Sequence, residues 1–540
     1  MKSTTWNRAS SNDESVMSVT TNNTSGSLQR YDGQPLDTDE DEQLFFVTSY
    51  SDFNSLAHGP KGTEASKSIY VYRFHPNDGS MLLLNVHGDS TDVPNPAFSR
   101  YHPRLSIVYC CTEDCNNNGK IFAYKIGVEG ALEQFGEPVD AGGTSTCYLT
   151  ISKDQKNLLV VNYWNSTLCV IGLDYQTGAM GHAIKSTYDP KGGKEMVACL
   201  KAAGGANHSC NDEATIKARQ ADPHSHALVL DPYVGRVAYV PCLGKDVIRE
   251  FYYDAHNGAI GLELNTLPPG LGGDRPDGPR YFEFHPKYNV AYVVNEFSCT
   301  VAVFEVDRNL LQEIYVASKR GEDMTKFKGR STLRLIQSIS TLPSAFPTEM
   351  NTCGRIAVHK TGKFVIVSNR GHQSITVFRV KTTGRNKGKL VQVGIFHTRG
   401  ECPRHWTFDD SGSWLLVANQ DSDNLKVFSF NLSSGELKYT GNEYRVLSPN
   451  FVCSVPPHQW DESELPTVVS EGNLISRNHT MTRFESSDTD GSYPSDSEES
   501  SKTPNVWDCD KTSEQILQDE LAHARNEIAD LKKLLLEKAS

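Results

Sequence analysis

The sequence has no apolar run long enough to anchor it in a membrane or to direct its secretion. No stretch approaches the roughly 18 apolar residues of a membrane span, and the N-terminus lacks an apolar core of signal-peptide length. We therefore expect a cytoplasmic protein that makes no membrane contact.

Positive charge is scarce as well. The 540 residues include 53 Lys and Arg against 66 Asp and Glu, which gives a formal net charge of −13. Proteins that bind nucleic acid present a basic surface to the phosphates. We therefore expect no nucleic-acid partner.

The cysteines do not form the pairs that a metal site needs. There are 13 of them, an odd and scattered set in which Cys110, Cys111 and Cys115 cluster. No CxxC pair is followed by a second pair or by two histidines, and no glycine motif of a nucleotide site is present. We expect free thiols, no metal and no cofactor.

Composition divides the chain into four parts. Residues 1–42 are rich in Ser, Thr, Asn and Asp and predict a disordered tail. Residues 43–457 alternate short β-rich runs with Gly, Asn, Asp and Pro turns. Residues 458–511 contain "ESSDTDGSYPSDSEESS" at 485–501 and predict an acidic, Ser-rich disordered linker.

Residues 512–540 predict a short coiled-coil helix. Thr512 and Gln515 have capping-box spacing. An a/d seam follows at Leu517, Leu521, Ala524, Ile528, Leu531 and Leu535. A helix this short is marginal alone in water, so we expect it to self-associate. Packing on its own domain and binding of another protein are the alternatives.

A repeated phrase runs through residues 43–457. "GPRYFEFHPKYNVAYVVNEFSCTVAVFEVD" begins at Gly278, and related copies begin at 95, 145, 224, 353 and 402. Copies start roughly 50 residues apart, and each contains strands of five to seven residues joined by polar turns. Three or four antiparallel strands at this period are typical of a propeller blade.

A seventh blade can be assembled from both ends of this region. Residues 44–51 and 68–74 have the pattern of middle strands, and residues 448–456 can supply the missing inner strand. Joining both termini in one sheet removes the exposed edges. We therefore predict an all-β, seven-bladed propeller over residues 43–457, with insertions at about 182–222 and 308–346.

Two aligned positions carry charged residues. The first slot, just before the inner strand, is filled by Ala97, Cys147, His226, Arg280, Gly354 and Arg404. The second slot, at the end of the second strand, is filled by Glu113, Tyr163, Leu243, Glu296, Arg370 and Gln420. Equivalent positions of successive blades converge on the propeller axis.

This convergence predicts an anion-binding pocket with an acid/base group at one mouth of the propeller. We expect its ring to contain His226, Arg280, Glu296, Arg370 and Arg404, with Glu113, Tyr163, His224, His372 and His405 nearby. Arg binds phosphate or carboxylate through its planar fork of donors, and His is the side chain most easily poised near neutral pH. In the alternative interpretation, Arg and Glu pair across the channel and plug it.

The same residues resemble the lactonase family of seven-bladed propellers. The resemblance rests on "DPHSHALVLDP", "GPRYFEFHP", "YVVNE", "VSNRGHQS" and "CPRHWTFDDSGSWLLVANQDS", and it covers about residues 43–457. That family includes the propeller type of 6-phosphogluconolactonase and the fungal carboxymuconate-lactonizing enzymes.

By motif position, the resemblance implies catalytic roles for one histidine, two arginines and a glutamate, namely His226, Arg280, Arg370 and Glu296. Arg404 matches a second "PR" arginine of the family, and we expect it to bind substrate together with His224, Glu113 and Tyr163, which the repeat places near the ring. "PHSH" offers two candidate histidines, Tyr281 stands where His is common in the family, and the insertion at 182–222 is not typical of it.

Our first hypothesis from these residues is that the protein hydrolyses a sugar-phosphate lactone, a small anionic substrate, without a metal ion. Arg370 and Arg404 would hold the phosphate, and Arg280 would stabilise the oxyanion. Either Glu296 or His226 would activate water. A cycloisomerase that clamps the carboxylates of a muconate, and a non-catalytic interaction propeller, are the alternatives.

Overall fold

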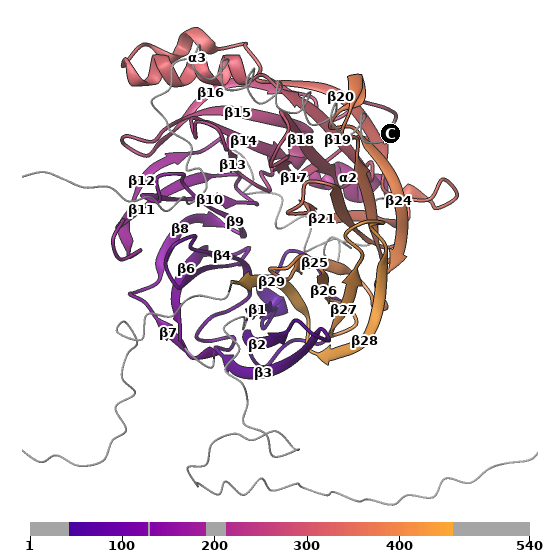
Figure 1. Ribbon diagram of the computed structural model, residues 1–540. Helices are drawn as coiled ribbons and strands as arrows, with labels where there is room; N and C mark the ends of the chain where they lie inside the picture. Colours follow the sequence, from indigo (N-terminus) through magenta and orange to yellow (C-terminus); the bar gives the residue numbers. More distant parts are fainter. Residues whose placement is uncertain (1–42, 128–129, 191–211, 457–540) are drawn as a thin grey trace, which may run out of the picture. The chain divides into compact units, whose positions relative to one another are not determined.

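The computed structural model describes residues 43–127, 130–190 and 212–456. In these residues seven antiparallel β-sheets stand around a central axis (Figure 1). This confirms the predicted seven-bladed propeller and each of the six repeats as a blade. The predicted tail at 1–42, the linker at 458–511 and the helix at 512–540 lie outside the described residues.

The two inner positions of each sheet are occupied as follows. The innermost strands are β29 (Pro449–Val455), β4 (Pro96–Tyr101), β9 (Thr146–Ile151), β13 (Val229–Leu230), β17 (Pro279–Phe284), β21 (Thr352–Val358) and β25 (Pro403–Phe408). The second strands are β1 (Gln43–Ser49), β5 (Ile107–Thr112), β10 (Asn157–Asn162), β14 (Val237–Cys242), β18 (Val290–Asn295), β22 (Phe364–Arg370) and β26 (Trp414–Asn419).

The two outer positions complete the sheets. The third strands are β2 (Ile69–His75), β6 (Asn118–Ile126), β11 (Leu168–Leu173), β15 (Val247–Asp254), β19 (Thr300–Val306), β23 (Ser374–Val380) and β27 (Asn424–Phe430). The outer strands are β3 (Ser80–His87), β7 (Leu132–Gln134) with β8 (Val139–Thr144), β12 (Met180–Tyr188), β16 (Ala259–Leu267), β20 (Leu333–Ser340), β24 (Leu390–His397) and β28 (Leu437–Arg445). Both β7 and β8 pair with β6.

The hydrophobic core lies between neighbouring blades. Six of the seven second strands are buried along their whole length, which explains their apolar sequences. The outer strand β12, in contrast, alternates between exposed and half-buried residues. Burying a Val, Leu or Ile side chain contributes about 1.5–3 kcal/mol, so the second strands hold the ring together.

One blade joins the two ends of the propeller. Strand β29 pairs antiparallel with β1, and Phe46 lies opposite Cys453. The inner strand predicted at residues 448–456 is therefore present. Because the closing strand comes from the far end of the domain, the ring has no open sheet edge between its first and last blades.

The described parts of the inserted segments contain two α-helices. Helix α3 (Arg308–Lys319) begins after Asp307, whose side chain accepts a hydrogen bond from Leu310 N, and it packs its buried apolar side on the propeller. Helix α2 (Glu213–Arg219) belongs to the insertion expected at 182–222. Short 3-10 turns are η1 (Phe53–Ser55), η3 (Leu243–Lys245), η4 (Met324–Phe327), η5 (Thr348–Met350) and η6 (Gly384–Asn386).

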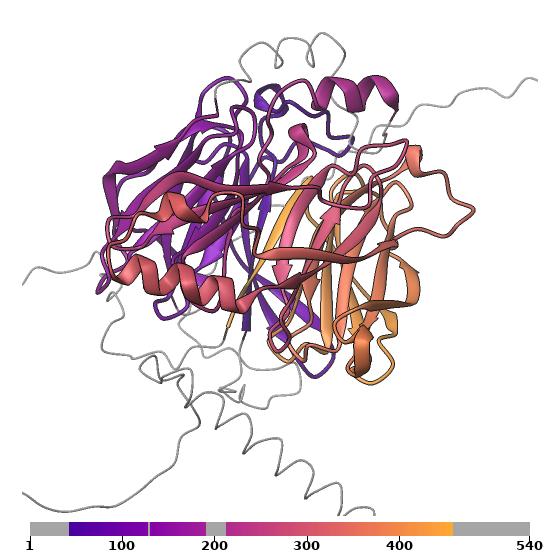
Figure 2. The same cartoon turned by 90° about the horizontal axis from the view of Figure 1, so that it is seen from above.

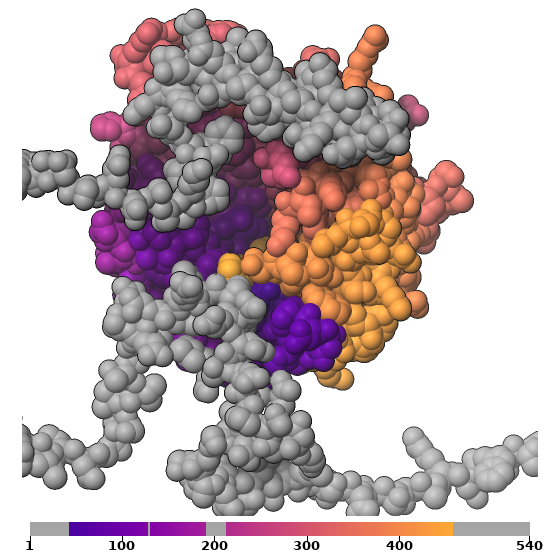
Figure 3. Space-filling model, viewed as in Figure 1, coloured from indigo at the N-terminus to yellow at the C-terminus, as the bar shows by residue number. Residues whose placement is uncertain are grey.

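Helix α2 and the loop that contains η1 lie on the same face of the ring, the face away from the viewer of Figure 1 (Figure 2). Figure 3 shows the opposite face, with a hollow near the centre of the ring. Among the described residues, no helix combines the length and the apolar character needed to cross a bilayer.

Candidate functional site

A β-bulge directs the first-slot side chain out of the ladder. Pro279 and Tyr281 pair with successive residues of β18, so Arg280 is the extra residue of its strand. The register shifts in the same way at Arg404. Gly278, two residues before Arg280, has a φ of 64°, where a side chain would meet the ring of the neighbouring phenylalanine. The bulge and the left-handed backbone conformation of Gly278 change the direction of the strand end, as bulges beside active sites do.

A buried asparagine positions the second slot. In four second strands this asparagine is the last or the second-last residue. The four are Asn162, Asn295, Asn369 and Asn419. Each Nδ2 donates to a side chain five residues later and to a backbone carbonyl in or just after the outer strand of the preceding blade. The turn that these bonds fix also holds the residue after the asparagine, which is Tyr163, Glu296, Arg370 or Gln420.

Glu296 is the centre of the site. Its Oε2 lies 2.9 Å from Arg280 Nε and 3.1 Å from Arg370 Nη2, and its Oε1 lies 2.6 Å from Arg219 Nη1. The glutamate side chain is 1 % exposed. Arg370 also donates from Nη2 to the backbone oxygen of Cys353 at 2.7 Å. The aligned positions therefore do meet on the axis, as the repeat predicted.

Sequence reasoning missed Arg219. This residue ends α2, outside the repeat, and its guanidinium also donates to the Tyr163 hydroxyl at 3.1 Å and lies 4.9 Å from the centre of the Phe297 ring. No blade alignment contains this position, so the sequence offered no signal for it.

A second carboxylate, Glu113, has a different environment. It accepts a hydrogen bond from the Tyr50 hydroxyl at 2.8 Å, and its carboxylate oxygens lie 3.6 Å from His58 Nδ1 and 3.9 Å from Arg404 Nη2. The Arg404 guanidinium also lies over the Tyr50 ring. Tyr50 follows the second strand β1 and so occupies the second slot of the closing blade, a signal that a seven-copy alignment would have contained. His58 lies in a loop and carries no such signal.

The charges around the two carboxylates keep both ionised. Burial raises the pKa of Glu296, but Arg219, Arg370 and Arg280 outweigh burial and hold the pKa far below its usual range. Burial also raises the pKa of Glu113, but His58 and Arg404 outweigh it and lower the pKa to about 2. Neither carboxylate is therefore a strong base.

The histidines are neutral at physiological pH. Burial and the charge of Arg280 lower the pKa of His226 well below its usual range. Burial lowers the pKa of His224 to about 3, and burial and the charge of Arg404 lower that of His58. The expected poise near neutral pH is thus absent, because burial disfavours the charged imidazole and nearby guanidiniums add to this effect.

His226 and His224 differ in their contacts. The His226 ring packs edge-on against Tyr163 and Tyr281, and its buried Nδ1 has no hydrogen-bond partner among the described residues. His224 lies flat on the Tyr163 ring, and its Nδ1 is 3.1 Å from the Tyr163 backbone oxygen. The His226 ring thus has a nitrogen without a partner among the described residues, whereas His224 supports Tyr163.

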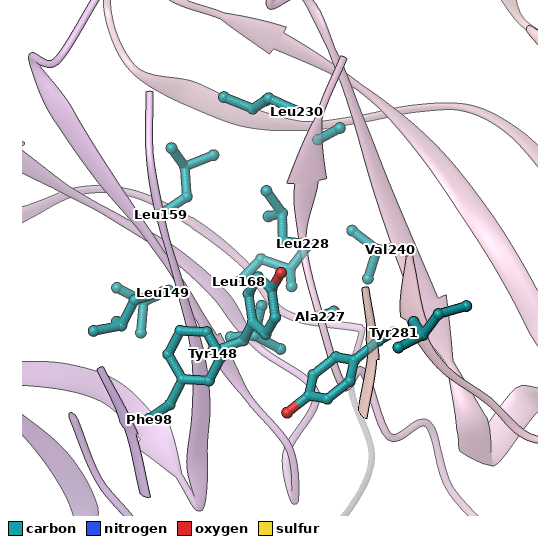
Figure 4. Packing of buried hydrophobic residues seen from close by; sticks show 14 of the residues in the cluster. Phe98, Tyr148, Leu149, Leu159, Leu168, Ala227, Leu228, Leu230, Val240 and Tyr281 are labelled. Carbon is teal, nitrogen blue, oxygen red and sulfur yellow. The ribbon is translucent and has the colours of Figure 1, made fainter. Parts of the chain in front are cut away.

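An aromatic collar lies one position further along the inner strands. It consists of Phe451, Phe98, Tyr148, Ala227, Tyr281, Arg355 and His405, one residue from each blade. The Phe98 ring centre lies 4.5 Å from that of Tyr148, which in turn lies 5.5 Å from Tyr281 (Figure 4). The collar borders the ionic cluster on the inner side, since Arg280 lies over the Tyr281 ring.

Two histidines expected near the site take part in other contacts. His405 belongs to the collar, where it stacks on Phe451 and contacts Arg355. His372 pairs through Nδ1 with the Ser374 hydroxyl and packs on Phe346. The described residues contain no set of three or more His, Cys, Asp or Glu side chains arranged to hold a metal ion.

The guanidiniums keep donors that no described residue accepts. These buried atoms are Arg280 Nη1, Arg370 Nε and Nη1, and Arg404 Nη1. Four guanidiniums against two carboxylates leave the cluster with a net charge of +2 while its histidines are neutral. Unpaired buried donors are costly, and an anion on the axis would satisfy them.

Comparison with known proteins places the chain among lactonase-like propellers. The model of the family described as "Lactonase, 7-bladed beta-propeller" matches residues 44–454. The 6-phosphogluconolactonase of Bacillus subtilis is 26 % identical over 395 residues, which cover 73 % of this chain and 95 % of that protein. An uncharacterised protein of Lactococcus lactis subsp. cremoris is 30 % identical over 392 residues, covering 72 % and 96 %. The structure of the periplasmic gluconolactonase of Pseudomonas aeruginosa shares the fold, with a TM-score of 0.59 and 23 % identity over 77 % of this chain and all of that one.

Proposed function

This chain belongs to the seven-bladed β-propeller lactonase family, and we propose that it hydrolyses a lactone that carries a phosphate ester, such as 6-phosphoglucono-δ-lactone. One observation carries the proposal: buried guanidinium donors without partners among the described residues converge on an axis of net positive charge. The name of the Bacillus subtilis relative supports the same substrate class.

The charge of the site suits a dianion. A phosphate monoester carries about −1.5 to −2 at pH 7, which matches the net charge of +2. Arg370 would bind the phosphate oxygens through Nε and Nη1, and Arg404 through Nη1, the donors that have no partner among the described residues. Planar guanidinium forks fit tetrahedral oxyanions through paired, charge-assisted hydrogen bonds.

His226 is the better of the two proposed bases. Both oxygens of Glu296 are held by guanidiniums, and its low pKa makes it a poor proton acceptor. His226 is neutral, and its buried Nδ1 has no hydrogen-bond partner among the described residues, so this nitrogen could accept a hydrogen bond from water once substrate opens the site. Water would lose its proton to this nitrogen as its oxygen bonds to the lactone carbonyl carbon.

Arg280 and Glu296 have complementary roles in this scheme. Arg280 Nη1 would donate to the carbonyl oxygen as it becomes an oxyanion. The ring C–O bond then breaks, and the proton on His226 passes to the ring oxygen, giving the open hydroxy acid. Glu296 would keep the Arg280 and Arg370 guanidiniums in place through its Oε2.

The test is turnover by the full-length chain. Opening of 6-phosphoglucono-δ-lactone, followed by acid release, should exceed the spontaneous rate measured without protein. Arg280→Ala should lower kcat by about 100- to 1,000-fold, the usual cost of losing an oxyanion donor. Arg334→Ala, at an arginine whose side chain is 73 % exposed on β20, is the matched control and should keep full activity.

Three outcomes would overturn the proposal. The first is full turnover by Arg280→Ala. The second is turnover of a carboxymuconate alone, which would assign the site to a cycloisomerase. The third is the absence of turnover with every lactone tried, together with tight capture of a protein partner.

A further inference from the structure

Arg219 differs from the other central arginines in its origin. Arg280, Arg370 and Arg404 occupy blade positions, whereas Arg219 is carried by α2 in the insertion between β12 and β13. Yet it is as buried as they are, with a side chain that is 3 % exposed. An inserted segment therefore places a charge at the centre of the site.

Contacts at both ends hold α2 in position. Asp212 caps the helix by accepting a hydrogen bond from Thr215 N. Ile216 packs on Leu243 and Phe297. Beyond the helix, the backbone oxygen of Ala221 accepts a hydrogen bond from Lys245. The helix is thus anchored to the turn that follows β14 and to the residue after Glu296.

The same helix reaches the Glu113 side of the site. Ala218 packs on a small cluster formed by Ala57, Cys115 and Trp164. Cys115 lies two residues after Glu113, and Ala57 lies next to His58. Helix α2 therefore bridges the surroundings of both carboxylates on one face of the ring (Figure 2).

The contact between Arg219 and Glu296 decides where the other guanidiniums point. Arg219 binds Oε1, while Arg280 and Arg370 share Oε2. Without Arg219, the glutamate would lose one of its three guanidiniums, and the Nη1 atoms of Arg280 and Arg370 belong to guanidiniums that already bind it. These donors would turn toward the glutamate, because a buried carboxylate that loses a charged partner is costly.

We propose that Arg219 is a positioning residue supplied by the insertion, which saturates Glu296 so that Arg280 and Arg370 keep their free donors for the substrate. It also raises the net charge of the cluster from +1 to +2, and so favours a dianionic lactone over an uncharged one. The substrate part of this inference rests on the proposed lactonase function.

The test compares Arg219→Gln with the wild type on two substrates. With 6-phosphoglucono-δ-lactone, Arg219→Gln should raise KM by about 10- to 100-fold, the equivalent of one charged hydrogen bond, and lower kcat less. With unphosphorylated glucono-δ-lactone, KM should change by less than about threefold. Arg219→Lys restores the charge but not the fork, so it should recover part of the selectivity.

A pH profile separates positioning from a general loss of structure. Arg219 is the largest of the charges that lower the pKa of Glu296 and also lowers that of His226, so its removal raises both pKa values. Glu296 must be ionised to hold Arg280 and Arg370, so the acid limb of kcat/KM should move to higher pH in Arg219→Gln. The substrate phosphate also titrates near pH 6, but equally in both proteins. Unchanged KM, selectivity and acid limb in a folded Arg219→Gln would overturn the inference.

Binding of 6-phosphogluconate, the product of the proposed reaction, keeps the two proposals distinguishable. If the wild type hydrolyses no lactone, the proposed function fails, but calorimetry still tests Arg219 through the same 10- to 100-fold loss of affinity, about 1.4–2.8 kcal/mol. If Arg219→Gln does not fold, Arg219→Lys provides the test. Equal affinity of that variant and the wild type would overturn the inference.

Discussion

Glu113 and Glu296 occupy the same second slot in two blades, yet their environments differ sharply. Glu296 has three guanidiniums within 3.1 Å and a side chain that is 1 % exposed. Glu113 has a phenol, an imidazole and one guanidinium at 3.9 Å, and its side chain is 11 % exposed. The propeller repeat sets where these carboxylates lie, but loops and insertions set what they can do.

The difference assigns the two residues distinct tasks. Glu296 is a fixed anion that orders arginines, because both of its oxygens are bound. Glu113 is held by a phenol, an imidazole and one more distant guanidinium, and its greater exposure leaves it more room to contact a ligand or water. The stability and activity of variants at these two positions should therefore diverge.

Glu296→Gln should have the largest effect. Removing the carboxylate leaves Arg219, Arg280 and Arg370 buried without their counter-ion, which costs about 3–5 kcal/mol of unfolding free energy. Urea denaturation at pH 7 measures this cost. A loss below 1 kcal/mol would show that the guanidiniums do not depend on Glu296.

Glu113→Gln should cost less, about 1–3 kcal/mol at pH 7. The folded pKa of Glu113 is lowered from 4.5 to about 2, so its contribution is present above pH 4.5 and is lost as the pH falls toward 2. The difference in unfolding free energy between wild type and Glu113→Gln should therefore shrink between pH 5 and pH 3. The difference for Glu296→Gln should persist to lower pH, and the reverse order would contradict the comparison.

The smallest effects should come from the two tyrosines. Tyr50→Phe removes a donor from Glu113, which should cost about 1 kcal/mol. Tyr163→Phe removes an acceptor from Arg219, whose guanidinium keeps Glu296, so it should cost less. Thermal unfolding of the two variants measures this ranking. A larger loss of stability for Tyr163→Phe would contradict it and would show that the hydrogen bond to Arg219 contributes more than the one to Glu113.

The sequence predicted the fold and the axial positions because both follow the repeat. Copies of the phrase at Gly278 became blades, and residues 448–456 closed the ring. Arg280, Glu296 and Arg370 met on the axis since bulges and asparagine turns recur in several blades.

The residues that the sequence did not predict lie outside that periodicity. Arg219 and His58 come from connections whose path depends on tertiary packing, so no alignment of blades contains them. The low pKa of His226 depends on its burial and on the guanidiniums near it. The aligned positions of the repeat do not give either quantity. Tyr50 was recoverable, because the closing blade has a second slot of its own.

The central claim is that arginines from different blades keep free donors for a dianionic ligand. Calorimetric titration of the wild type with 6-phosphogluconate and with gluconate tests it most directly, with Arg370→Ala as the variant and Arg334→Ala as the control. The account predicts that 6-phosphogluconate binds at least about 100-fold more tightly than gluconate, and that Arg370→Ala loses about 10- to 100-fold of that affinity. Equal affinity for the two ligands, or an unchanged affinity in Arg370→Ala, would contradict it.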